Sequence, residues 1–302
     1  MLRAMDRHDP QAPVGHAPGT RARSRAAVLG HPIAHSLSPT LHRAAYESLG
    51  LADWRYDAVD VTEDGLAAFV GSLDDTWAGL SLTMPLKQTV LGLLDHVEPL
   101  AEVVGAVNTV LLQGSGAGRV LVGANTDVYG LVTALGEGLT GGTAARVGTA
   151  AVLGAGATAA STLAALGQLG CTTAVVYVRS VPRAGGLVRA AHRMGVQPVL
   201  RSLDDAVDQI GTADVVVSTL PPHAADDLAA ALPGARPAGV LLDVAYDPRP
   251  TALSAAWAAR GGVVVGGERM LLHQAVEQVR LMTGRPGPVD AMAAALDARL
   301  AS

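Results

Sequence analysis

A run of 32 residues without a formal charge, between Arg146 and Arg179, constrains this chain more than any other feature of its sequence. A membrane-spanning helix needs about 20 consecutive apolar residues, so the run is long enough to cross a bilayer. It contains many Ala, Gly, Ser and Thr residues and few large aliphatic ones, however, so insertion would gain little free energy. We therefore expect the run to be buried inside a globular protein, and we predict no membrane association.

Within this run, a short apolar strand is followed by a glycine-rich turn and a helix. The residues from Gly154 to Ala159 fit the pattern G-x-G-x-x-A, directly after the strand expected over 150–153. In dinucleotide-binding folds, the first Gly permits a tight turn and the second lets the backbone approach the pyrophosphate. The small third residue lets the helix pack closely on the strand. The helix N-terminus then offers free N–H groups to the phosphates, so the pattern predicts a dinucleotide site.

The residues after the next expected strand indicate which dinucleotide would bind. An NAD site usually carries an Asp or Glu at this strand end, where it binds the ribose 2′-hydroxyl. Here the strand expected over 174–178 is followed by Arg179, Ser180 and Arg183, with no acidic residue nearby. Guanidinium groups form paired hydrogen bonds with phosphate oxygens, which favours the 2′-phosphate of NADP. A solvated arginine at the end of a strand is the alternative.

Composition excludes several other classes of protein. One Cys in 302 residues cannot form an internal disulfide, which indicates a reducing compartment and a cytoplasmic location. The net charge of −5 argues against a nucleic-acid-binding protein. Residues 1–24 are rich in Pro, Gly and Arg without an apolar signal core, so we expect a disordered lead, with a targeting presequence as the alternative. Prolines interrupt the spacing of His31, His35 and His42, so we expect no metal site.

Strands and helices alternate along the rest of the chain, which is typical of an α/β fold. Near-continuous aliphatic segments after residue 150 indicate parallel strands covered on both faces, as in a Rossmann-type doubly wound sheet. A Gly-Gly-Thr break at 141–143 separates them from an N-terminal α/β domain. The expected strands cover 26–30, 54–61, 79–83, 150–153, 174–178, 215–217, 240–244 and 263–265. The expected helices cover 40–49, 66–73, 87–94, 158–169 and the chain from residue 268 onward.

Polar residues of the N-terminal half predict an anion site and an acid–base pair. We expect Ser38 to be the N-cap of the helix over 40–49, with Ser36 beside it. Two hydroxyls and free N–H groups can bind a small carboxylate there, and N-capping alone is the alternative. Lys87 lies in the first turn of a later helix, where a cation opposes the helix dipole and does not serve stability. Asp127 follows the end of a strand and offers a matching acid.

Taken together, these segments resemble the shikimate dehydrogenase family. The resemblance begins with His35-Ser36-Leu37-Ser38-Pro39, the T-x-P-x-K run from Thr83 to Lys87, and Gly105-Ala106-Val107-Asn108-Thr109. It continues with Asn125-Thr126-Asp127, the segment from Asp243 to Pro248, Gly267, and Met270-Leu271-x-x-Gln274. The segments occur in family order from about residue 26 to the end of the chain.

The resemblance implies an enzyme that reversibly reduces 3-dehydroshikimate to shikimate with NADPH, in the biosynthesis of chorismate and the aromatic amino acids. Lys87 and Asp127 would be the catalytic pair. The substrate carboxylate and ring hydroxyls would be bound by Ser36, Ser38, Ser81, Thr83, Asn108, Tyr246 and Gln274. The cofactor would be bound by Gly154, Ala155, Gly156, Ala157, Thr158, Arg179, Ser180, Arg183 and Gly267.

The resemblance also implies an order of domains. A substrate-binding α/β domain would cover 25–128, an NADP-binding Rossmann domain 129–266, and helices that pack back on the substrate domain 267–302. The chain has Ser81, Ala157 and Val178 where the family usually has Asn, Gly and Asn.

Two alternatives remain open for the function. A quinate/shikimate or aminoshikimate dehydrogenase with relaxed cofactor use is the nearer one, and a non-catalytic sensor of shikimate or quinate is the one from another class. In each case we expect a small-molecule ligand and a monomer or homodimer.

Overall fold

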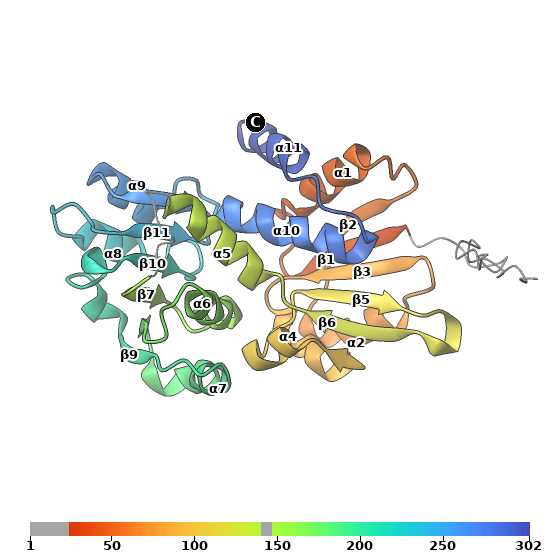
Figure 1. The fold of residues 1–302 in the computed structure, drawn as a ribbon, viewed down its shortest axis with the longest axis horizontal. Coiled ribbons are helices and arrows are strands. Elements are labelled where there is room, and N and C mark those ends of the chain that lie inside the picture. Colours follow the sequence, from red (N-terminus) through yellow and green to blue (C-terminus); the bar gives the residue numbers. More distant parts are fainter. Residues whose placement is uncertain (1–23, 140–146) are drawn as a thin grey trace, which may run out of the picture.

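The computed structural model describes residues 24–139 and 147–302, and Figure 1 shows them as two α/β halves, each built around one sheet. The expected N-terminal lead lies outside the described residues, apart from Ser24. The α/β prediction is confirmed in both halves, because each sheet has six strands with helices between them.

The N-terminal sheet is mixed, with the strand order β2-β1-β3-β5-β6-β4. Strands β1, β2 and β3 are parallel to one another, whereas β5 runs antiparallel to both β3 and β6. The antiparallel β5–β6 hairpin was not predicted. The strands are β1 (Arg25–Gly30), β2 (Arg55–Asp60), β3 (Trp77–Leu82), β4 (His96–Val97), β5 (Thr109–Gln113) and β6 (Val120–Ala124).

Helices cover both faces of this sheet. Along β1, Ala27 and Leu29 face the core under α2, α3 and α4, while Ala26 and Val28 face α1 and the C-terminal part of the chain. The three predicted helices are present, but the last is a short α-helix followed by a 3-10 turn at Val90–Leu93. The helices are α1 (Ser38–Ser48), α2 (Glu63–Gly71), α3 (Leu86–Thr89) and α4 (Pro99–Val104).

The second sheet is entirely parallel, with the order β12-β11-β10-β7-β8-β9, as the aliphatic segments predict. Helices α6 and α7 cover one face and α8 and α9 the other, so the doubly wound prediction is confirmed. The strands are β7 (Ala150–Leu153), β8 (Val175–Val178), β9 (Val199–Ser202), β10 (Val215–Ser218), β11 (Val240–Asp243) and β12 (Val263–Gly266). The helices are α6 (Ala157–Gln168), α7 (Gly185–Arg193), α8 (Asp226–Ala231) and α9 (Ala252–Ala259).

Strand β9 is the one strand of this sheet that the sequence did not predict. It lies at the edge, and none of its residues is fully buried, so it lacks the aliphatic pattern of its neighbours. The uncharged run is accounted for by β7, α6 and β8, which contribute mostly buried residues to the core. Across residues 24–139 and 147–302, no helix has both the length and the apolar character that a membrane span requires.

Two long helices join the halves: α5 (Asp127–Gly138) and α10 (Gly267–Thr283), which lie between the two sheets in Figure 1. They cross at Gly130, where a Cβ atom would lie only 2.7 Å from the carbonyl oxygen of Met270 and 3.0 Å from Cβ of Gln274. A residue with a side chain therefore cannot occupy this position without moving α10. The crossing fixes the position of Asp127, at the start of α5, relative to Gln274.

The C-terminal helices pack on the N-terminal half. Residues Leu272 and Val279 of α10, together with Met292 of α11 (Val289–Leu300), form one apolar cluster with Leu37 and Leu41 at the start of α1. The boundaries proposed for the domains at 25–128, 129–266 and 267–302 stay a prediction.

The crossing at Gly130 makes a prediction about stability. We expect Gly130→Ala to lower the free energy of unfolding by about 1–3 kcal/mol, because overpacking at a rigid contact is destabilising. The matched control is Gly136→Ala in the same helix, where a Cβ would meet nothing within 4 Å. That change should stabilise the protein by about 0.5–1 kcal/mol through helix propensity. Urea unfolding measures both, and effects of the same sign would contradict the close crossing.

Candidate active site

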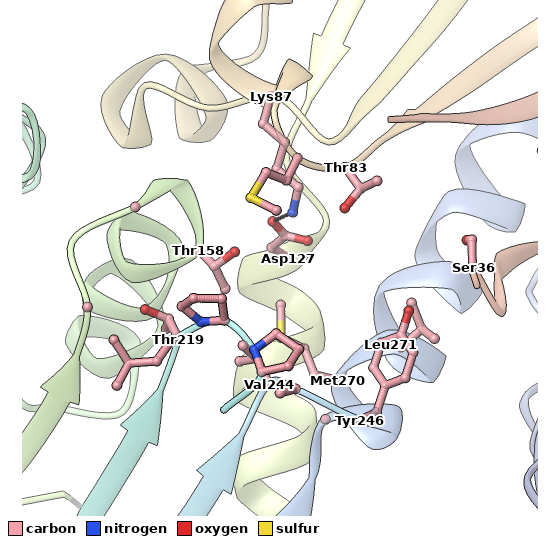
Figure 2. Close-up of a pocket in the computed structure, with 18 of the residues that line it drawn as sticks. Ser36, Thr83, Lys87, Asp127, Thr158, Thr219, Val244, Tyr246, Met270 and Leu271 are labelled. Atoms are coloured by element: carbon pink, nitrogen blue, oxygen red, sulfur yellow. Dashed lines mark hydrogen bonds and ion pairs between the residues drawn. The ribbon is translucent and has the colours of Figure 1, made fainter. Parts of the chain in front are cut away.

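The two halves face each other across a cleft of about 1030 Å³. Figure 2 shows Lys87 and Asp127 meeting in this cleft, with Ser36 and Tyr246 to one side and Thr158 to the other. All of the predicted site residues except Asn108 and Ala157 line the cleft. Asn108 is buried directly behind the lining, and Ala157 is the first residue of α6.

The most enclosed charged groups in the cleft are Lys87 and Asp127. Lys87 Nζ donates to Asp127 Oδ2 at 2.5 Å, and the side chains are only 14% and 4% exposed. Asp127 is the first residue of α5, where the positive end of the helix dipole favours a carboxylate. Lys87 lies in the first turn of α3, as predicted, and its charge is compensated by Asp127 rather than by its own helix.

Asn108 binds the carboxylate oxygen of Asp127 that does not contact Lys87. Its Nδ2 donates to Asp127 Oδ1 at 2.8 Å, and its Oδ1 accepts the backbone N–H of Thr126 at 2.8 Å. An amide held at both ends cannot rotate freely, so Asp127 keeps one orientation toward Lys87. Gln274 Oε1 also lies 3.3 Å from Asn108 Nδ2.

The start of α1 differs from the prediction. Leu37 is the N-cap and Ser38 is the first helical residue, so the expectation that Ser38 caps the helix was wrong. The N–H groups of the first helical turn have no hydrogen-bond partner within the helix, so a proline, which lacks an N–H, is tolerated at any position of that turn. Pro39 can therefore be the second helical residue, and the helix begins earlier than predicted, at Ser38. Ser36 Oγ accepts the backbone N–H of Ser38 at 3.4 Å. Both serines still line the cleft.

Beneath the cleft lies a buried polar cluster of four residues: His42, Tyr56, Ser81 and Gln278. Only Ser81 was predicted as a site residue. Tyr56 donates to Ser81 at 2.6 Å, Ser81 donates to Gln278 at 2.8 Å, and His42 Nε2 lies 3.2 Å from Gln278 Oε1. The position of Gln278, four residues after Gln274 on one helix face, was a signal that could have identified it.

The glycine-rich turn has the geometry that a pyrophosphate needs. Gly154 has φ of +111°, and a Cβ there would lie 2.5 Å from Thr219 Oγ1, so both its conformation and its surroundings require glycine. A Cβ at Gly156 would meet nothing within 4 Å, which leaves open space above the turn. Thr219 lines the cleft too and was not predicted. The turn fits a dinucleotide phosphate on the start of α6.

Arg179 and Arg183 follow β8 at the edge of the cleft and are both exposed. Within the part of the chain that the structure describes, neither guanidinium forms an ion pair with a carboxylate. Ser180 lines the cleft between them. The three side chains therefore offer uncompensated positive charge and a hydroxyl, which suit a phosphate group.

The remaining predicted residues stand on β11, β12 and α10 or just after them. Burial raises the pKa of Tyr246, so its phenol stays protonated and can donate a hydrogen bond. A Cβ at Gly267 would lie 2.3 Å from the carbonyl oxygen of Val244, so the backbone passes very close there. Gln274 Nε2 donates to the carbonyl of Leu271 at 2.8 Å. Among residues 24–139 and 147–302, no group of three or more His, Cys, Asp or Glu side chains is placed to hold a metal ion.

A dinucleotide-type turn and a buried Lys–Asp pair on one cleft define a nucleotide-dependent oxidoreductase built from two α/β halves. The sequence matches the family models for the shikimate dehydrogenase substrate binding domain at residues 28–110 and the shikimate 5'-dehydrogenase C-terminal domain at 267–296. Residues 149–246 match the model for coenzyme F420-dependent NADP oxidoreductases. The chain belongs to the shikimate dehydrogenase family.

Individual relatives agree with this assignment. A shikimate dehydrogenase (NADP(+)) from Oleidesulfovibrio alaskensis is 39% identical over 268 residues, which cover 86% of this chain and 90% of that protein. The crystal structure of Mycobacterium tuberculosis shikimate dehydrogenase has a TM-score of 0.79 and 41% identity, covering 91% of this chain and 99% of that one. A shikimate 5-dehydrogenase from Thermus thermophilus, in complex with NADP(H) and shikimate, has a TM-score of 0.76 and 34% identity, covering 92% and 99%.

The buried cluster beneath the cleft predicts a pH-dependent stability. Burial lowers the pKa of His42 from 6.5 to about 3, although its hydrogen bond to Gln278 acts in the other direction. The unfolded chain therefore binds a proton below about pH 6.5 that the folded chain does not, so stability falls as the pH drops through this range. The slope is at most about 1.4 kcal/mol per pH unit for one group.

We expect His42→Phe to remove this slope between pH 6.5 and pH 5, measured by urea unfolding at several pH values. Phe keeps a ring against Tyr56, on which His42 stacks with a centroid separation of 3.9 Å. The control is His192→Phe at an exposed position of α7, which should leave the slope as in the wild type. An unchanged slope in the His42 variant would contradict its role.

Proposed function

We propose that this chain is an NADP-dependent shikimate dehydrogenase, which reversibly reduces 3-dehydroshikimate to shikimate. The observation that carries the proposal is the Lys87–Asp127 pair, enclosed in a cleft that a dinucleotide turn lines on one side and Ser36 and Ser38 line on the other. A relative that shares this family and most of the chain length carries the same named activity.

The cofactor side of the cleft would hold NADP. Backbone N–H groups from Gly154 to Thr158 would bind the pyrophosphate, with Ala155 and Ala157 adding no side chain that would obstruct it. Arg179, Ser180 and Arg183 would bind the 2′-phosphate, because paired guanidinium contacts suit its oxygens. Gly267 would let the backbone approach the nicotinamide end. NADPH, when bound, supplies the hydride for the reduction.

The substrate side would bind a carboxylate and ring hydroxyls. Ser36 and Ser38 at the start of α1, with the protonated phenol of Tyr246, supply donors for the carboxylate. Ring hydroxyls would be bound by Ser81, Thr83, Asn108 and Gln274. Hydrogen bonds to both ends of the ring would fix the C3 carbonyl beside Lys87.

The proton of the reaction would come from Lys87. As hydride adds to C3 of 3-dehydroshikimate, negative charge develops on the carbonyl oxygen, and the ammonium group stabilises that charge by a hydrogen bond. Lys87 then gives a proton to this oxygen, which becomes the C3 hydroxyl of shikimate; in the oxidation it takes the proton back. Asp127 orients the ammonium group, and Asn108 holds Asp127.

We expect Lys87→Ala to lower kcat by about a hundredfold or more, the scale of a lost general acid, while the Kd for shikimate changes little. Steady-state kinetics and calorimetric titration measure the two quantities. The control is Gln88→Ala, at the exposed neighbouring position of α3, which should retain wild-type kcat. Near-normal turnover in the Lys87 variant would overturn the assigned role.

A second test compares four rates: shikimate or quinate, each with NADP+ or NAD+. We expect the highest kcat/KM for shikimate with NADP+. Arg179→Ala should raise the KM for NADP+ by about tenfold or more and change that for NAD+ little, because one phosphate contact is lost. Arg189→Ala, an exposed arginine on α7 outside the cleft lining, is the control. A preference for quinate with NAD+, or binding of shikimate without turnover, would contradict the proposal.

A further inference from the structure

Gln278 stands where two hydrogen-bond paths meet beneath the cleft. Its side chain belongs to α10 and is almost completely buried, with 1% of the residue exposed. Its Oε1 accepts from Ser81 Oγ at 2.8 Å and lies 3.2 Å from His42 Nε2. Its Nε2 donates to the backbone carbonyl of Asn108 at 3.2 Å and to Thr109 Oγ1 at 3.0 Å.

The chemistry of these partners determines which way the amide points. A backbone carbonyl can only accept, so the Gln278 atom facing Asn108 must be the nitrogen. Thr109 agrees, because its hydroxyl proton is donated to Asn108 Oδ1 at 2.9 Å and its oxygen is free to accept. The amide oxygen then faces Ser81 and His42. All four hydrogen-bonding positions of Gln278 are filled, so it has none left for a bound ligand.

The first path leads to the floor of the cleft through Ser81. The hydroxyl of Ser81 has one proton and two lone pairs. The proton is donated to Gln278, and one lone pair accepts from Tyr56 at 2.6 Å. One lone pair remains, and Ser81 lines the cleft. As long as Gln278 holds the proton, Ser81 can only accept a hydrogen bond from a molecule in the cleft.

The second path leads to the Lys–Asp pair. Gln278 holds the hydroxyl of Thr109, which donates to Asn108 Oδ1, and the other end of that amide donates to Asp127 Oδ1 at 2.8 Å. Asp127 Oδ2 in turn accepts from Lys87. Each group from Gln278 to Asn108 donates a hydrogen bond to the next, and Asn108 donates to Asp127. A substitution of Gln278 therefore removes a partner of Thr109, and Thr109 is one of the residues that fix the Asn108 amide.

We propose that Gln278 is a positioning residue for the reaction, which fixes Ser81 as an acceptor-only group and holds Asn108 and Asp127 in place toward Lys87. This inference rests on the proposed function, since it assigns Ser81 to a ring substituent of the substrate. The substituent over Ser81 must be a hydrogen-bond donor, a hydroxyl or an amine. A substrate analogue with hydrogen or fluorine at that position leaves the lone pair of Ser81 unmatched.

The test is Gln278→Leu, with Val279→Ala as its matched control. Val279 is the next residue of α10, equally buried, but it packs against α1 in an apolar cluster. We expect Gln278→Leu to raise the KM for shikimate and to lower kcat, each by about tenfold for the loss of a buried hydrogen-bonded partner, with the KM for NADP+ unchanged. Val279→Ala should change none of the three by more than about twofold.

A spectroscopic readout separates positioning from a general structural role. Lys87 is the only lysine in the sequence, so incorporation of lysine labelled with ¹³C at Cε gives one side-chain NMR signal that reports on the Lys–Asp pair. We expect this signal to move in Gln278→Leu and to stay in place in Val279→Ala. A signal that stays in place in both variants, with KM and kcat close to wild type, would overturn the inference.

Single variants test each path even if Gln278→Leu fails to fold. Ser81→Ala should raise the KM for shikimate with kcat nearly unchanged, and Thr109→Val should lower kcat and move the Lys87 signal, because it removes a partner of the Asn108 amide. Where Gln278→Leu does fold, it should raise KM less in the Ser81→Ala background than in the wild type, because both variants act on the contact that Ser81 makes with the substrate. A lower kcat with an unchanged KM in Ser81→Ala, or a wild-type kcat and Lys87 signal in Thr109→Val, would contradict the two paths.

The wild type keeps this test distinct from that of the proposed function. If it does not oxidise shikimate with NADP+, the proposed function fails, and the Lys87 signal still decides whether Gln278 acts on the Lys–Asp pair. If the wild type is active but Gln278→Leu has the same KM, kcat and Lys87 signal as the control Val279→Ala, the proposed function stands and only the inference about Gln278 fails.

Discussion

The buried ion pair between Lys87 and Asp127 is the interaction on which the rest of the site depends. Two charges in so enclosed a position are stable only with good geometry and further hydrogen bonds, and removing one partner of such a pair typically costs about 3–5 kcal/mol. Asn108 and the N-terminus of α5 supply that support. The same contacts that make the pair tolerable in the fold also hold it in the orientation that the proposed proton transfer would require.

The pair can form because the chain crosses between its halves at a close contact. Asp127 is the first residue of α5. Three residues later, the absence of a side chain at Gly130 allows the backbone of α10 at Met270 to pack directly against the backbone of α5. This approach brings Gln274 and Gln278 beneath residues of β3 and β5 that lie far away in the sequence. Ser81 and Gln278 are separated by 197 positions, and their hydrogen bond is one result of this packing.

What could be predicted from the sequence was local. Gly154 and Gly156 were recognisable because their turn is defined by neighbouring residues, and Lys87 because a cation in the first turn of a helix has no local benefit. The contacts of Tyr56, His42 and Gln278 in the buried cluster were not recognisable, since each depends on partners from other elements. The wrong prediction for Ser38 has a similar cause. The sequence allows α1 to begin at Ser38 or at Pro39, and the path of the chain around Ser36 decides between these two positions. The hairpin of β5 and β6 was missed because alternation of strands and helices predicts parallel pairs.

Helix α10 contributes residues to the cleft along several of its turns, and the helical repeat decides which of its side chains face the N-terminal sheet. Gly267 opens it beside Val244, and Gln274 and Gln278 follow on the face that meets the N-terminal sheet. Because successive residues of an α-helix are rotated by about 100°, inserting or deleting one residue between Gly267 and Gln274 would turn both glutamines away from the sheet. Substitutions in this segment can be absorbed one at a time, but a change in its length cannot. In this family member, the spacing of seven residues between Gly267 and Gln274 is therefore as much a part of the site as the residues themselves.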